Sequence, residues 1–183
     1  MITDIYYVIP EIFLSLSLMF LLILGVFKKN GSTLVYNLSL LILIITIPIL
    51  LNVPSTSEIL VFNESYKVDY LSIFIKILII VSTLFVLLTS SEYLKSTKIY
   101  NIEYPILILS SILGMMVMVS SNDLIVFYIG LELQSLALYV LASFNRDNEL
   151  SSESGLKYFV LSALSSGLLL YGCSLVYGFS SST

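Results

Sequence analysis

The sequence is poor in the residues that hold metals and redox cofactors. Its 183 residues include no histidine and one cysteine, Cys173. A single thiol forms no intrachain disulfide and cannot by itself hold a zinc ion or an iron–sulfur cluster. Without histidine, haem ligation and proton transfer through an imidazole are excluded as well. The sequence therefore predicts no metal site and no cofactor site in this chain.

Charged side chains are scarce too. They make up 11% of the residues, whereas hydrophobic residues make up 58%, and a typical soluble domain is about 25% charged. The apolar runs are continuous and about 20 residues long, which is the length of an α-helix that crosses a bilayer. They lack the inside–outside alternation of a membrane barrel. The sequence therefore predicts an all-α integral membrane protein.

Six apolar runs predict six transmembrane helices in a single membrane domain, residues 1–183. In the one sizeable loop, the strand-like segment Glu58–Phe62, followed by Asn63-Glu64, predicts a small hairpin over the membrane surface. Between the fourth and fifth runs, Ser120-x-x-Asp123 predicts a capping box for the fifth helix. The expected helices cover about 7–27, 34–52, 70–90, 104–119, 123–144 and 152–177.

The connectors between these helices differ in positive charge, and this difference predicts the orientation. Lys67 is alone on one side, whereas alternate connectors hold Lys28, Lys29, Lys95, Lys98 and Arg146. Because short cytoplasmic loops are enriched in Lys and Arg, both termini should lie outside. Only three alanines occur, a bias that suits an A/T-rich organelle genome. We therefore expect a multi-pass protein of the mitochondrial inner membrane, with its termini on the intermembrane-space side.

Glu132 is the most unusual residue of the fifth expected helix. It lies nine residues past Asp123, about 14 Å deep and close to the middle of the bilayer. Tyr128, Ser135 and Tyr139 stand at helical spacing on either side of it, and together they form one polar stripe, which should face another helix or water. Glu132 is therefore a candidate proton-carrying carboxylate. The alternative is a protonated carboxyl that hydrogen-bonds a neighbouring helix.

Lys157 lies about 8 Å into the sixth expected helix, from the opposite side of the membrane. Small polar residues, among them Ser162 and Ser165, share its helix and allow close packing and the entry of water. Because the two helices are consecutive and antiparallel, Lys157 could couple to Glu132 through water or another group. The alternative is an anchor whose stem reaches the inner interface.

Three other ionisable residues suggest simpler roles. Lys76 sits two turns inside the third expected helix, and we interpret it as an anchor that reaches outward to the interface. Glu11 and Asp69 stand at helix starts, where a carboxylate meets the positive end of the helix dipole.

Two motifs resemble one family of membrane proteins. They are Tyr128-Ile-Gly-Leu-Glu132-Leu-Gln-Ser-Leu and Ser154-Gly-Leu-Lys157-Tyr-Phe-Val-Leu-Ser-Ala-Leu-Ser. With Val68-Asp69 and the turn at 120–123, they closely resemble subunit 2 of mitochondrial NADH–ubiquinone oxidoreductase (complex I), the counterpart of subunit N of the bacterial enzyme. The resemblance covers essentially the whole chain.

This resemblance implies an antiporter-like subunit of the membrane arm, which couples quinone reduction in neighbouring chains to proton translocation. It implies that Glu132 is the key carboxylate and that Lys157 modulates its proton affinity. Tyr128, Ser135, Tyr139, Ser162 and Ser165 are the expected supporting polar residues. NADH, FMN, iron–sulfur clusters and ubiquinone are expected in other subunits and not in this chain.

The sequence departs from the family because its members have further helices, including a second repeat. We therefore expect the N-terminal part of a split or fragmented subunit. Its partners would be a separate chain that supplies the remaining helices, the other membrane-arm subunits and lipids, with no nucleic acid. Two alternatives stay open. One is a cation–proton antiporter or membrane-hydrogenase subunit of the same superfamily, and the other is a structural or assembly role.

Overall fold

The computed structural model describes residues 2–27, 31–54, 58–97 and 99–180, and these are almost entirely helical. The predicted all-α membrane fold is therefore confirmed. In chain order the elements are α1 (Ile2–Tyr7), α2 (Ile9–Phe27), α3 (Ser32–Leu51), β1 (Ile59–Val61), β2 (Tyr66–Val68), α4 (Tyr70–Ser96), α5 (Glu103–Val119), α6 (Leu124–Ala142) and α7 (Glu149–Ser180).

Among the described residues, five helices are long and apolar enough to cross a membrane: α2, α3, α4, α6 and α7. The sixth, α5, has 17 residues and extends about 25 Å, close to the thickness of a hydrocarbon core. Two helices continue beyond the apolar runs of the sequence. α4 reaches Ser96, and α7 runs from Glu149 to Ser180, because backbone hydrogen bonding does not stop where the hydrophobic residues do.

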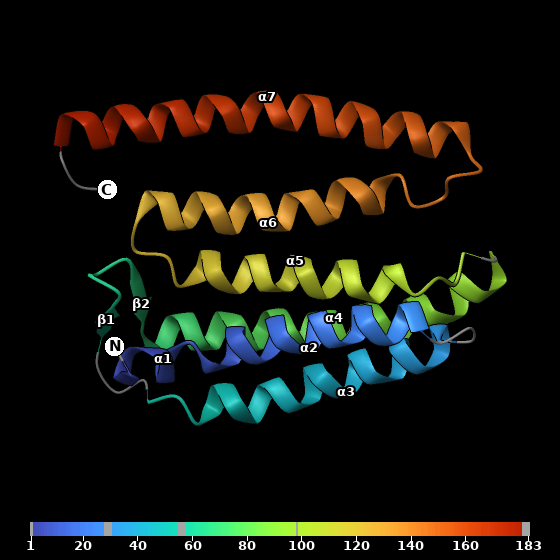
Figure 1. Ribbon diagram of the computed structural model, residues 1–183, viewed down its shortest axis with the longest axis horizontal. Coiled ribbons are helices and arrows are strands. Elements are labelled where there is room, and N and C mark those ends of the chain that lie inside the picture. The colour runs from blue at the N-terminus through green and yellow to red at the C-terminus, as the bar shows by residue number, and fades with distance from the viewer. Residues whose placement is uncertain (1, 28–30, 55–57, 98, 181–183) are drawn as a thin grey trace.

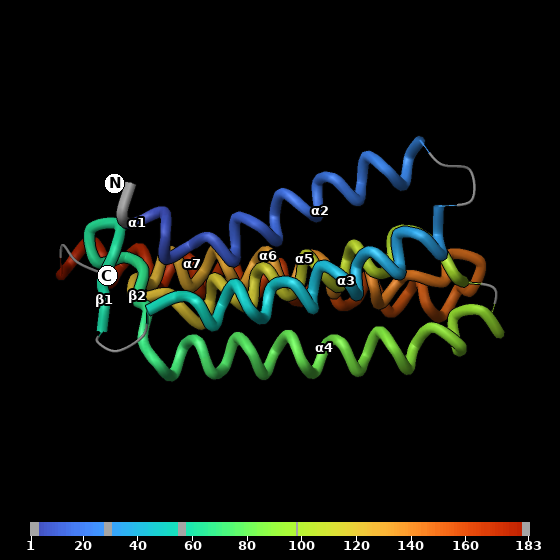
Figure 2. Tube along the Cα trace, turned by 90° about the horizontal axis from the view of Figure 1, so that it is seen from below, coloured from blue at the N-terminus to red at the C-terminus, as the bar shows by residue number. Residues whose placement is uncertain are grey.

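The helices run side by side along one long axis (Figure 1). α5 is central, since it packs against α2, α3 and α4 as well as against α6. Figure 2 shows α2 and α4 on opposite sides of the layer that holds α5, α6 and α7. The core is formed by apolar residues whose exposure is zero: Leu14, Leu21, Leu43, Ile80, Leu87, Leu109, Ile112 and Met116.

α5 and α6 approach so closely that their backbones touch. A Cβ atom added to Gly130 would lie 2.8 Å from the backbone nitrogen of Met118 and 2.9 Å from the carbonyl oxygen of Gly114. A Cβ on Gly114 would lie 2.6 Å from the backbone nitrogen of Gln134. Small residues at a crossing allow this approach inside a membrane, where dispersion contacts drive helix association. Gly114 and Gly130 therefore set the distance between α6 and α5, the central helix.

The predicted hairpin is confirmed. β1 and β2 pair antiparallel with Ile59 opposite Val68, and the turn between them has positive φ at Phe62, Asn63 and Glu64. The hairpin also binds the α5–α6 turn, because the backbone N–H of Lys67 donates to the carbonyl of Ser120 at 2.8 Å. Packing against helices is what a two-stranded hairpin needs to be stable.

The predicted capping box at 120–123 is wrong. Ser120 ends α5, and Asp123 is the N-cap of α6, where its carboxylate accepts from the backbone N–H of Ile125. The turn is so short that Ser120 is the C-cap residue of the preceding helix. A capping box does occur at the start of α4, where Asp69 and Ser72 exchange hydrogen bonds of 2.7 and 3.0 Å.

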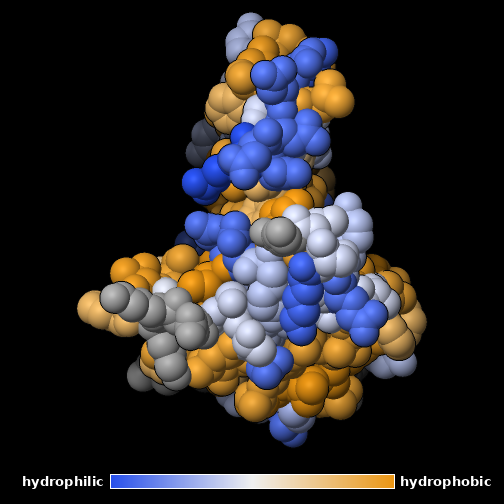
Figure 3. Space-filling view, turned by 90° about the vertical axis from the view of Figure 1, so that its right-hand side faces the viewer, coloured by the Kyte–Doolittle hydropathy of each residue, from blue (hydrophilic) through white to orange (hydrophobic). Residues whose placement is uncertain are grey.

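The connectors fall at two opposite ends of the bundle. We call the end with both termini and the hairpin the hairpin end, and the end with the α2–α3, α4–α5 and α6–α7 connectors the connector end (Figure 1). Figure 3 looks onto the connector end and shows hydrophilic side chains gathered there, with hydrophobic ones along the flanks. Lys95 and Arg146 lie at this end and Lys67 at the other, whereas Lys28, Lys29 and Lys98 fall outside the described residues.

Candidate functional site

Glu132 lies on α6 between the core and α7. Its side chain is partly buried, and its Oε1 atom is buried without a hydrogen-bond partner in the described part of the chain. A buried polar atom without a partner costs about 1–3 kcal/mol. Such an atom is expected where a proton, a water molecule or a group from another chain completes the site. Glu132 is therefore open to chemistry that this chain does not satisfy by itself.

The polar stripe around Glu132 faces α7. Tyr128 lies close to both Glu132 and Ser166 of α7. One turn beyond, the hydroxyl of Ser135 donates to the carbonyl oxygen of Glu132 at 3.1 Å. Tyr139 is buried and packs edge-on against Tyr158, with 4.9 Å between ring centroids. The stripe thus includes a carboxyl–phenol contact within α6, and its Tyr139 ring packs against both Tyr158 and Phe159 of α7.

Lys157 does not meet Glu132 in this chain. Its side chain is 70% exposed, and its Nζ atom lies 2.6 Å from Oε1 of Glu153, one turn earlier on α7. The contacts of Tyr139 with Tyr158 and of Tyr128 with Ser166 place residue 162 or 163 level with Glu132. Lys157 is then about six residues, or about 9 Å, nearer the connector end.

The serines predicted to support the site differ in their surroundings. Ser162 is partly buried and lies level with Glu132, whereas Ser165 is exposed. Of the described residues of α7, Gly155 alone is buried. The face of α7 that carries Lys157 and Ser165 is therefore open, and any group that joins Lys157 to Glu132 must be added from outside this chain.

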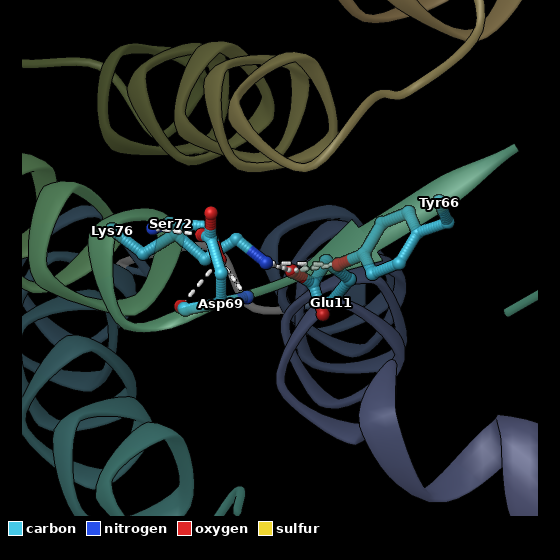
Figure 4. A network of polar contacts seen from close by, with 5 residues as sticks. All are labelled: Glu11, Tyr66, Asp69, Ser72 and Lys76. Atoms are coloured by element: carbon cyan, nitrogen blue, oxygen red, sulfur yellow. Dashed lines mark hydrogen bonds and ion pairs between the residues drawn. The ribbon is translucent and has the colours of Figure 1, made fainter. Parts of the chain in front are cut away.

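The interpretation of Lys76 as an interfacial anchor is wrong. Its side chain is 2% exposed, and Nζ lies 2.6 Å from Oε1 of Glu11, whose side chain is 5% exposed. The hydroxyl of Tyr66 on β2 donates to the same carboxylate oxygen at 2.8 Å and accepts from Lys76 at 2.8 Å. Figure 4 shows the three side chains converging from α2, β2 and α4. We call Glu11, Tyr66 and Lys76 the buried triad.

The triad forms because the hairpin covers the end of the bundle. Tyr66 points inward from β2, and burial, reinforced by the Glu11 carboxylate beside it, raises the pKa of this phenol far above its ordinary value. Tyr66 therefore remains a hydrogen-bond donor. Lys76 cannot reach outward to the interface because its ammonium finds two partners inside. The ion pair compensates two charges that would otherwise be costly at this depth.

One signal in the sequence could have revealed the triad. Glu11 and Lys76 carry opposite charges in two apolar helices, and both lie within about 9 Å of the same membrane face. Two opposite charges at the same depth in different helices tend to pair, because isolated charges in a membrane are expensive. Interpreting each residue separately missed this relation.

Comparison with known proteins finds a matching family model and similar proteins. A family model described as NADH:quinone oxidoreductase/Mrp antiporter, TM, matches residues 121–183. The chain is 70% identical over 177 residues to the NADH-quinone oxidoreductase subunit N of Pelagibacter ubique, covering 97% of the chain and 38% of that relative. It is 50% identical over 182 residues to subunit N of Maricaulis maris, covering 98% and 38%. The chain thus spans about 38% of the length of these relatives.

Two solved structures share the fold. A chain of respiratory complex I from Thermus thermophilus with bound aureothin superposes with a TM-score of 0.78 at 27% identity, covering 94% of this chain and 37% of that one. A chain of the membrane-bound sulfane sulfur reductase, an archaeal respiratory membrane complex, superposes with a TM-score of 0.80 at 17% identity, covering 98% and 38%. The latter likeness concerns the fold alone.

Proposed function

Because this chain is homologous over almost its whole length to part of subunit N of NADH-quinone oxidoreductase, we propose that it works in the membrane arm of respiratory complex I. In this role it couples electron transfer from NADH to quinone to proton translocation. The single observation that carries the proposal is Glu132, a partly buried carboxyl with an unpartnered oxygen on a helix inside the region matched by the antiporter model.

Glu132 takes up and releases the proton in this proposal. Its unpartnered Oε1 atom can accept a proton without the loss of a protein hydrogen bond. Tyr128 lies close enough to respond to the charge of Glu132. Lys157 lies on α7 about six residues from the level of Glu132. It modulates the charge of Glu132 through water or through groups that bind the open face of α7. Ser135, Tyr139, Ser162 and Ser165 line the stripe and the facing helix.

The redox cofactors are assigned to other subunits in this proposal. NADH, FMN, iron–sulfur clusters and ubiquinone belong to neighbouring chains of the complex, and this chain contributes no redox step. Its contribution is the movement of charge within the membrane.

We further propose that the remaining helices of an N-type subunit cover α7. The relatives are longer than this chain, and α7 exposes large apolar side chains along its length, among them Leu156, Leu161, Leu164 and Leu168. Purification of the tagged protein in mild detergent should yield the other membrane-arm subunits and those helices. A stable, active preparation of this chain without them would contradict the proposal.

The membrane compartment is also part of the proposal. The charge asymmetry between the two ends fits an orientation with both termini outside. The relatives named above are bacterial, so that outer side is the periplasm in a bacterium. In a mitochondrion, as the composition suggests, it is the intermembrane space.

Replacement of Glu132 by Gln tests the function. The amide keeps the size of the side chain but cannot ionise, so the complex should assemble while proton translocation per electron falls. Glu149→Gln, which removes an exposed carboxylate in the first turn of α7, is the matched control and should leave translocation near normal. Proton uptake by reconstituted vesicles and NADH oxidation are measured together. Loss of assembly, with unchanged pumping per electron in the complex that still forms, would instead support a structural role.

A cation–proton antiporter is the second candidate, since the description of the matching family model includes Mrp antiporters. Vesicles that contain the purified assembly distinguish the two. Sodium-driven proton movement without NADH and quinone would favour the antiporter, and NADH-driven movement without a sodium requirement would favour complex I.

A further inference from the structure

The buried triad is separate from the Glu132 stripe, and the proposed function does not use it. Its three residues come from α2, β2 and α4 at the hairpin end, and each is at most 6% exposed. Three titratable groups in direct contact form an unusual cluster for a membrane-embedded bundle, where ionisable residues are expensive and generally functional. The hydrogen bonds within the cluster indicate what it can do.

These hydrogen bonds are distributed unevenly over the Glu11 carboxylate. Lys76 and Tyr66 both donate to Oε1, at 2.6 and 2.8 Å. Oε2 is buried as well, yet it has no partner among the residues that the structure describes. The hydroxyl oxygen of Ser120, which lies beside Tyr66, is likewise buried and unpartnered within those residues. Oε1 of the carboxylate therefore carries both hydrogen bonds, and Oε2 is buried and open.

Because both hydrogen bonds go to Oε1, a proton can bind Oε2 of Glu11 without breaking either of them. A proton that binds Oε2 converts the carboxylate to a carboxylic acid and leaves the two bonds to Oε1 in place. Lys76 keeps its ammonium, so the triad gains one positive charge and loses it again when the proton leaves. A water molecule fits the chemistry of the open side, because water donates and accepts and usually makes about three hydrogen bonds when buried. We propose that the triad, with Ser120, is a second proton-exchange site, in which an internal water delivers the proton to Oε2 of Glu11.

The hairpin gives this site a route to solvent. Its strands have three residues each, and short two-stranded hairpins are marginally stable. The attachment beside the site includes the Lys67–Ser120 bond and a 3.0 Å bond from the backbone N–H of Asn122 to the carbonyl of Ser65. The side-chain amide of Asn122 also donates to the carbonyl of Glu64 at 2.7 Å. Local opening of such an element is less costly than unfolding of the bundle. Water can therefore exchange at Glu11 while the helices stay packed.

The charges around the triad are already paired or engaged elsewhere. Lys67 lies 3.0 Å from Glu58 and 3.5 Å from Asp69 at the rim of the hairpin. Asp123 caps α6, and Tyr7 of α1 packs against the apolar side of the hairpin. Within the described residues, the ammonium of Lys76 and the phenol of Tyr66 donate hydrogen bonds to Glu11.

A static ion pair is the competing explanation, and infrared spectroscopy distinguishes the two. The purified protein is titrated with acid, and the carboxyl stretching band is followed in H2O and in D2O. We expect a band that appears on acidification, shifts in D2O and is absent from Glu11→Gln. Glu64→Gln, which changes an exposed carboxylate at the hairpin turn, is the control and should retain the band. A wild-type titration with no Glu11-dependent band while the protein stays folded would overturn the proposal.

Two further variants keep the test decisive. Tyr66→Phe removes a donor to the carboxylate, so the Glu11 band should change in frequency. An unchanged band frequency would contradict the role of Tyr66. If Glu11→Gln does not fold, the double change Glu11→Gln with Lys76→Met removes both charges, which buried pairs often tolerate. Persistence of the band in that variant would overturn the assignment to Glu11. The readout does not depend on the Glu132 function, so either proposal can fail alone.

Discussion

At the scale of single residues, the chain handles its membrane-embedded charges in three ways. Lys76 and Glu11 neutralise each other in full burial, with 2.6 Å between Nζ and Oε1. Glu132 is partly buried and has an unpartnered oxygen. Lys157 stays exposed and pairs with Glu153 on its own helix. Full pairing favours stability, whereas the open carboxyl of Glu132 favours reactivity.

The buried pair makes a prediction about stability. Lys76→Met leaves Glu11 without its counter-ion and should lower the free energy of unfolding by about 3–5 kcal/mol. Adding Glu11→Leu to the same protein should recover most of this loss, because two uncharged side chains need no compensation. Lys67→Met at the exposed rim is the control and should cost little. Thermal unfolding in detergent measures all four proteins, and an unaffected Lys76→Met would show that the pair contributes no net stability.

Asp69 makes a prediction about pH. Desolvation raises its pKa, but the hydrogen bonds from Ser72 and the charge of Lys67 outweigh this effect, so the pKa is lowered. A carboxyl whose pKa is lowered by folding stabilises the folded protein. This stabilisation is complete above the unfolded-state pKa of about 3.9, and it is lost as the pH falls through the folded-state pKa. Protection of the hairpin amides against hydrogen exchange should therefore weaken in that acid range.

The control for this prediction is Asp69→Asn. Asparagine is also a good N-cap residue, so the start of α4 should remain folded. The variant should lose the part of the acid dependence that comes from Asp69. The same acid dependence in both proteins would assign it to another group.

At the scale of elements, α5 and α6 pack backbone against backbone at Gly114 and Gly130. Gly130→Ala would put a methyl group 2.8 Å from a backbone atom of Met118. Backbone cannot move aside as a flexible side chain can, so the helices must separate at a cost of about 1–3 kcal/mol. Gly167→Ala on α7 meets open space and should be neutral or slightly stabilising, because alanine favours helix. Thermal unfolding in detergent compares the two, and equal melting temperatures would contradict this packing.

α7 is an element of a different kind. Hydrogen bonds from Ser151 and Ser154 to the carbonyl of Ala142 join it to α6, and Tyr139 packs against Tyr158. Its outer side is open, and it stands apart from the main body of the bundle in Figure 3. A helix that faces outward on most sides contributes little to the core, and it presents a surface to lipid or to further helices.

At the scale of the whole molecule, the two ends should face opposite compartments. In a Cys173→Ser background, Glu64→Cys marks the hairpin end and Asp147→Cys marks the connector end. A membrane-impermeant thiol reagent added to intact cells or mitoplasts should label the Glu64→Cys protein. It should label the Asp147→Cys protein only after the membrane has been permeabilised. The reverse pattern would invert the orientation that the lysine and arginine distribution predicts.

The sequence by itself determined the helical membrane fold, the alternation of the connectors between two ends and the hairpin. Long apolar runs and turn residues are local features, and a local segment can specify whether it crosses the membrane or turns. It also identified the surroundings of Glu132, because Tyr128 and Tyr139 share its face through helical spacing alone.

The tertiary structure decided which helix faces meet. It paired Lys76 with Glu11 across 65 positions of sequence, brought Gly114 against Gly130 and left Lys157 on the open side of α7. It also made Asp123 the cap of α6, because the hairpin and the end of α5 fix the turn before it. These outcomes depend on the rotation of each helix about its axis and on the depth at which helices pass one another. Packing between distant segments sets both quantities, and hydrophobicity along the chain does not encode them.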